Sequence, residues 1–109
     1  MNRQDVYKLI DGERNYQTGR WNSQTTSSGG FHSVEEWYVY LQDYVTEGIH
    51  TLARLPRQEA DPKAMSTIRK LAAMCVCAME QHDTYSRDLE QLVTVRQRDY
   101  DKRDPKDQP

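Results

Sequence analysis

The sequence has few of the features that mark a secreted protein, a membrane-spanning protein or a protein stabilised by bound metal ions. Its 109 residues include two cysteines and one phenylalanine, and no apolar run approaches the ~20 residues that cross a bilayer. Cys75 and Cys77 lie two positions apart, which places them on different faces of a helix, so neither a disulfide between them nor a zinc site is expected. Because neither a span nor a secretion signal is recognisable, we expect a cytoplasmic protein with no membrane partner.

Charge of one sign is not in excess either. Fifteen Lys and Arg residues are scattered among seventeen Asp and Glu residues, for a formal net charge of -2, so no basic stripe predicts nucleic-acid binding. Hydrophobic residues make up 36% of the chain, which leaves a modest core in one short domain. We therefore expect a single domain over residues 1–100 that forms a homo-oligomer, followed by a mobile charged tail at 101–109.

Apolar residues recur three or four positions apart in four segments, and no segment alternates as a strand would. Ser33 and Glu36 form a capping-box pattern at the start of the second segment, and Pro56 ends it. Asp61 followed by Pro62 predicts the start of the third segment. The expected fold is all-α, a small four-helix bundle-like domain with helices at residues 3–18, 34–55, 62–83 and 86–100.

The apolar stripes of the two middle helices are expected to face the core. The predicted core side of the second helix consists of Trp37, Leu41, Tyr44, Val45, Gly48, Leu52 and Leu55. That of the third helix consists of Met65, Ile68, Leu71, Ala72, Cys75, Val76 and Met79. The second helix also carries more aromatic surface than a thin core can bury, which favours a subunit interface through Trp37, Tyr38, Tyr40 and Tyr44.

A strip of acidic and polar residues runs beside the core stripe of the second helix, and it consists of Glu36, Tyr40, Asp43, Glu47 and His50. Asp43 and Glu47 are four positions apart and therefore neighbours, so their carboxylates can hold a hard cation such as Mg²⁺. The alternative is an ordinary solvated helix face, which is the commoner role of such residues.

The first helix places a carboxylate, a guanidinium and an amide close together at Glu13, Arg14 and Gln17. Arg14 either binds a phosphate or pairs with an acid of the second helix and pins the two helices together. In the loop that follows, Trp21 either stacks on a base or seals the end of the core.

The order of these features resembles the MazG-like all-α nucleoside triphosphate pyrophosphohydrolases, and in particular their short phage-encoded relatives. The resemblance spans roughly residues 5–83 and rests on an ER-x-x-Q motif followed by a tryptophan and on spaced acids in the second helix, namely Glu13, Arg14, Gln17, Trp21, Asp43 and Glu47. It implies a helical protein that binds a nucleotide, and in the enzymes of the family the acids of two helices hold Mg²⁺ against the phosphates.

The family's metal motif is incomplete in this chain. Its E-E-x-x-E would read Asp43, Tyr44 and Glu47, and its E-x-x-D would fall at Arg69 and Ala72, so two acids of four remain. The resemblance then implies a site that meets phosphate directly through Arg69 and Lys70 and lacks the metal that would activate water.

We expect a non-catalytic protein that sequesters or senses a nucleotide or phosphorylated small molecule, such as a host-defence signal, and that needs no cofactor. The expected ligand-binding residues are Glu13, Arg14, Gln17, Trp21, Tyr40, Asp43, Glu47 and Arg69. Two alternatives stay open. One is a nucleoside triphosphate pyrophosphohydrolase with Mg²⁺ on Asp43 and Glu47, and the other is a protein-interaction module that inhibits a host protein.

Overall fold

The computed structural model describes residues 1–20 and 30–91, and over these ranges the chain is helical and contains no strand. Three long helices are present: α1 (Arg3–Arg20), α2 (Val34–Arg54) and α3 (Arg57–His82). A fourth helix begins at residue 87, where Ser86 Oγ accepts a hydrogen bond from Leu89 N at 3.3 Å. The all-α prediction is therefore confirmed for the described residues, whereas the predictions for Trp21, for the end of the fourth helix and for the tail lie outside them.

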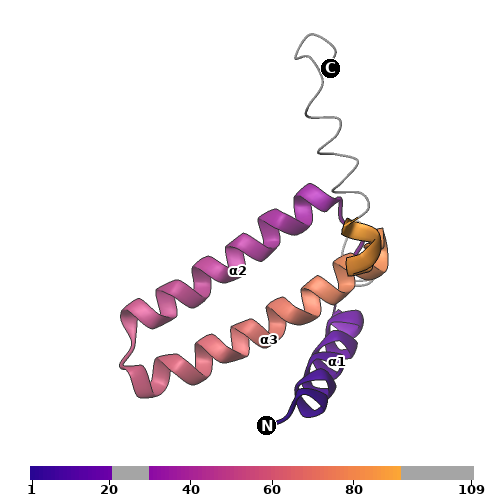
Figure 1. Ribbon diagram of the computed structural model, residues 1–109. Coiled ribbons are helices and arrows are strands. Elements are labelled where there is room, and N and C mark those ends of the chain that lie inside the picture. The colour runs from indigo at the N-terminus through magenta and orange to yellow at the C-terminus, as the bar shows by residue number, and fades with distance from the viewer. Residues whose placement is uncertain (21–29, 92–109) are drawn as a thin grey trace.

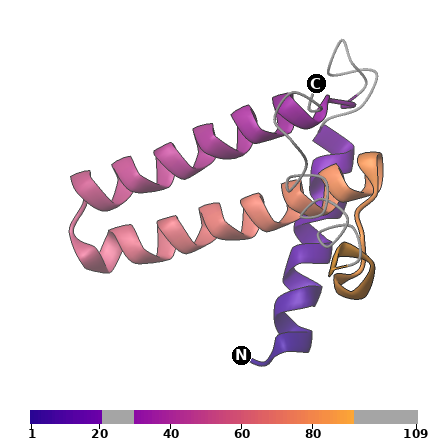
Figure 2. The ribbon, with the colours of Figure 1, turned by 45° about the horizontal axis from the view of Figure 1, so that its top comes forward.

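Helix α3 is the centre of the arrangement. Helices α2 and α3 run antiparallel as a long hairpin, and α1 crosses α3 at a steep angle near the end of the hairpin that is remote from its turn (Figures 1 and 2). The half of the hairpin nearest the α2–α3 turn has no other described helix beside it in either view. None of the described helices combines the length and the apolar character needed to cross a membrane.

Local sequence signals set both ends of α2. Ser33 Oγ accepts a hydrogen bond from Glu36 N at 3.1 Å, and the Glu36 carboxylate accepts one from Ser33 N at 3.0 Å, which confirms the capping box. At the other end, Leu55 N donates to Thr51 O at 3.2 Å, and Pro56 follows directly. The sequence pattern thus predicted this helix to within one residue.

The predicted start of α3 at Asp61–Pro62 is wrong. The helix begins five residues earlier, because the carbonyl of Pro56 already accepts hydrogen bonds from Glu59 N at 2.9 Å and Ala60 N at 2.8 Å. Pro62 consequently lies inside the helix, where it lacks one backbone donor. The extra turn buries Ala60, which is 1% exposed, and this packing outweighs the local start signal.

The core is small and lies on a different side of α3 from the one predicted. Its buried apolar members are Trp37, Ala60, Ala73, Met74 and Cys77. Trp37, a member of the predicted core side of α2, is 3% exposed as expected. The predicted core side of α2 is confirmed in part, since Trp37 and Gly48 are buried and Leu41 and Tyr44 pack against the core. Other members of the two predicted stripes are about half exposed: Val45, Leu52, Met65, Ile68 and Met79. Helix α3 turns a side of mostly small residues toward its neighbours, so its larger apolar side chains remain outside.

The side chain of Gln81 joins the start of α2 to the end of α3. Its Oε1 accepts hydrogen bonds from Trp37 Nε1 at 2.9 Å and from His32 N at 3.2 Å. Its Nε2 donates to Gly30 O at 2.8 Å. Next to it, His82 Nε2 donates to His32 O at 2.6 Å. One amide therefore satisfies two backbone groups of the segment that leads into α2 and the indole N–H of Trp37 in its first turn.

We expect Gln81→Met to destabilise the protein by about 2 kcal/mol, because methionine fills the space but leaves the Trp37 indole N–H and two backbone groups without their partner. Urea unfolding followed by circular dichroism measures the change. Gln58→Met is the matched control, since Gln58 is exposed on the same helix and its replacement should shift stability by a few tenths of a kcal/mol at most. Equal losses in both variants would contradict the role of Gln81.

The capping box also predicts a pH dependence. The hydrogen bonds from the backbone and hydroxyl of Ser33 lower the pKa of the Glu36 carboxyl below its ordinary value of 4.5. A carboxyl whose pKa is lowered by folding stabilises the folded state above that ordinary value, and the contribution disappears as the pH falls through the lowered pKa. The protection of the backbone amides at the start of α2, measured relative to their intrinsic exchange rate at each pH, should therefore fall below about pH 4.5, and Glu36→Gln should remove this pH dependence.

Candidate functional site

Two ion pairs attach α1 to α3. Glu13 Oε1 accepts from Arg69 Nε at 2.9 Å, and Arg14 binds Glu80 with both Nε and Nη2, at 2.8 Å and 3.3 Å. Arg14 Nη1 also donates to Thr18 Oγ1 at 2.6 Å. The helix-pinning interpretation of Arg14 is thus confirmed, but its acidic partner belongs to α3 and not to α2.

Between these two ion pairs, Gln17 inserts its side chain against α3. The residue is 3% exposed, and its Nε2 donates to the carbonyl of Lys70 at 3.2 Å. Its Oε1 is buried and has no hydrogen-bond partner among the described residues. A buried carbonyl oxygen without a donor is costly, so this atom has an unmet requirement for an N–H or O–H donor.

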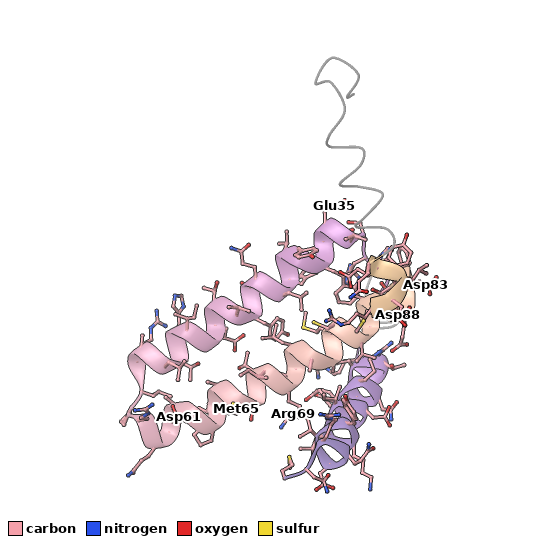
Figure 3. The ribbon with its side chains drawn as sticks, viewed as in Figure 1. Glu35, Asp61, Met65, Arg69, Asp83 and Asp88 are labelled. Atoms are coloured by element: carbon pink, nitrogen blue, oxygen red, sulfur yellow. The ribbon has the colours of Figure 1, made fainter. Side chains whose placement is uncertain are left out.

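A pocket of about 220 Å³ opens at this position, where side chains of all three long helices meet. Its lining consists of Glu13, Tyr16, Gln17, Arg20, Tyr44 and Lys70. Lys70 and Arg20 bring positive charge, Tyr16 and Tyr44 bring aromatic rings, and Gln17 brings the unpartnered oxygen. Figure 3 shows Arg69 on the stretch of α3 that passes α1, with Met65 and Asp61 farther along toward the turn.

Burial and the charged groups around the pocket shift the pKa of Tyr44. Burial raises the pKa of its hydroxyl, and the carboxylates of Glu47, Asp43 and Glu13 raise it further, while Arg20 acts in the opposite direction. The phenol therefore stays protonated at neutral pH and can donate a hydrogen bond. Helix α2 lines the pocket with Tyr44, and α3 lines it with Lys70.

The acidic strip of α2 lies outside this pocket. Asp43, Glu47 and His50 are exposed and border an open groove of about 480 Å³, which is lined by residues of α2 and by its C-cap Leu55. Within the described part of the chain, no three His, Cys, Asp or Glu side chains stand close enough together to hold a metal ion. Asp43 and Glu47 thus remain two acids on one helix face, without a third ligand from the described part of α1 or α3.

The structure divides the predicted ligand residues into groups. Glu13 and Gln17 line the pocket, and Arg14 and Arg69 form its supporting ion pairs. Tyr40 instead contacts His32, with ring centroids 4.7 Å apart. Three further lining residues were not predicted as ligand contacts, namely Tyr16, Arg20 and Tyr44, whereas Lys70 was expected to meet phosphate together with Arg69. Arg20 could have been found from its spacing of seven from Glu13 on one helix face, whereas Lys70 is brought to the site by tertiary packing.

Searches against protein-family models, curated proteins and solved structures find no match for this chain. The site must therefore be interpreted from its own residues.

We expect Glu13→Gln to loosen α1 by about 1 kcal/mol, since the neutral amide cannot balance Arg69, and the partial exposure of Arg69 limits the loss. Hydrogen exchange of the backbone amides in the last two turns of α1 measures the effect. Asp11→Asn is the control, because it removes one carboxylate from an exposed position of the same helix. If both variants exchanged at the same rate, the ion pair would not be what holds α1.

Proposed function

We propose that the protein binds a nucleotide or a phosphorylated small molecule in the pocket between α1, α2 and α3, and that it does so without hydrolysis. The observation that carries the proposal is the buried and unpartnered Oε1 of Gln17, a residue that lines the same pocket as Lys70. A ligand that combines a hydrogen-bond donor with an anionic group matches these two features.

The lining assigns a part of the ligand to each side of the pocket. Lys70, together with Arg20, attracts a phosphate group, and a point charge on a flexible stem suits this task. Tyr16 and Tyr44 present flat surfaces on which a base can stack. The Gln17 oxygen accepts from an exocyclic amine or a ribose hydroxyl. A nucleotide carries all three groups at once, which is the reason for preferring it.

The assignment differs from the sequence-based one in its cations. Arg14 and Arg69 were expected to meet phosphate, but each is already bound to a carboxylate of Glu80 or Glu13. In the proposal these arginines hold α1 in place, and Lys70 takes the phosphate. Asp43 and Glu47 contribute negative charge near Tyr44 and hold no metal.

The MazG-like relationship stays a prediction, and so do a phage origin, a cytoplasmic location and a host-defence signal as ligand. The resemblance contributes the nucleotide class to the proposal. The two acids that are missing from its metal motif are the reason for proposing binding without cleavage.

Isothermal titration with a panel of nucleoside mono- and triphosphates and cyclic dinucleotides tests the proposal. We expect at least one to bind both with and without Mg²⁺, and we expect Lys70→Ala to weaken that binding roughly tenfold or more, as the loss of a charge-assisted hydrogen bond does. Lys63→Ala is the matched control, because Lys63 is an exposed lysine of α3 that does not line the pocket.

Absence of binding across the panel, or equal weakening by both lysine variants, would contradict the proposed site. Release of pyrophosphate from a triphosphate in the presence of Mg²⁺, abolished in Glu47→Gln, would instead favour the hydrolase alternative. Native mass spectrometry of freshly purified protein adds an independent readout, since a co-purified ligand appears as added mass.

A further inference from the structure

The hairpin has a broad apolar face that the described part of the chain leaves uncovered. Its members on α2 are Val34, Tyr38, Val45, Ile49 and Leu52, with exposed fractions between 46% and 72%. On α3 they are Ile68 and Met79, at 52% and 45%, together with the exposed thiol of Cys75. We call these eight residues the apolar face.

Helix geometry places both sets on the same side of the hairpin. At ~100° per residue, the α2 members lie roughly 60–120° around the helix from Trp37, and the α3 members lie roughly 100–140° from Met74 in the same rotational sense. Trp37 and Met74 both point into the seam between the helices. Because the helices are antiparallel, equal rotation turns both stripes to one side.

Helix α1 and the ligand pocket lie on the other side. Arg69 and Glu80, which hold α1, are displaced from Met74 in the opposite rotational sense, and so are Lys70 on α3 and Glu47 on α2. The apolar face carries no Asp, Glu, Lys or Arg between Tyr38 and Leu52 or between Ile68 and Met79. A surface free of charge along three or four turns of two helices is unusual for solvent exposure.

We propose that the apolar face is the interface of a homodimer, in which a second copy of this chain packs its own hairpin against the first to form a four-helix core. The exposed side chains of the face amount to on the order of 800 Å², which equals the roughly 800 Å² that each partner contributes to an interface of standard size. Isolated surface patches on monomers are usually smaller than this.

A second copy fits this face better than a partner of different chemistry. A twofold axis that lies in the plane of the interface brings the same face of both copies together, so apolar side chains meet apolar side chains. No like charges face each other in that arrangement, since the face has none. The sequence pattern agrees, because Val45, Leu52 and Ile68 belong to the stripes that were predicted to be core, and a dimer buries them without changing the fold of either copy.

Sedimentation equilibrium over a wide range of protein concentrations tests the dimer. We expect a mass of twice 12.8 kDa for the unaltered chain, with a dissociation constant that changes little with salt, since no ion pairs hold the interface. Val45→Glu should raise that constant at least tenfold, because a carboxylate would be buried without a partner.

Val39→Glu provides the matched control. It makes the same substitution at another exposed valine of α2, which is 64% exposed and points away from the apolar face. Circular dichroism verifies that each variant stays helical, and Ile49→Lys replaces Val45→Glu if the latter fails to fold. A monomer at all concentrations, or an equal effect of Val39→Glu and Val45→Glu, would overturn the proposal. The test needs no ligand, so its result is independent of the proposed nucleotide site.

Discussion

The arrangement depends on the small side chains that α3 turns toward its neighbours. Ala60, Thr67, Ala73 and Cys77 permit close approach of helices on two sides, but they bury little apolar area. Polar interactions therefore determine the positions of α1 and α2 relative to α3. Gln81 fixes the entry into α2, and Gln17 with two ion pairs fixes α1. Since such bonds require defined geometry and apolar contacts do not, a thin core can still specify one arrangement.

The interactions that attach α1 to α3 also create the candidate site. To reach the carbonyl of Lys70, Gln17 must enter the seam between α1 and α3, and its second polar atom is then buried without a donor. Glu13 and Arg69 neutralise each other beside it, and the lining also contains the cations Lys70 and Arg20. The candidate site thus lies where the attachment of α1 leaves Gln17 Oε1 without a hydrogen-bond donor. In the proposed function, a ligand supplies that donor.

The hairpin separates two kinds of surface. One side carries α1, the pocket and the acidic strip of α2, and the other carries the apolar face. In the proposed dimer the apolar faces come together, so both pockets remain open on the outer surfaces of the assembly. Ligand binding and association would then use different residues, and a change at Val45 need not affect Lys70. The proposed dimer also buries the larger apolar side chains, which the monomer core cannot accommodate.

The sequence by itself determined the helical class, the capping box at Ser33, the end of α2 and the burial of Trp37, because these follow from hydrogen bonds and periodicity within a few residues. It also placed Glu13 and Gln17 on one face of α1. Only the tertiary structure decided which side of α3 is buried, that Arg14 pairs with Glu80, and that Lys70 and Tyr44 reach the pocket. The start of α3 at Arg57 likewise depended on the packing of Ala60. Periodicity shows that a helix has an apolar side, but it does not show whether that side packs within the chain or against a second chain.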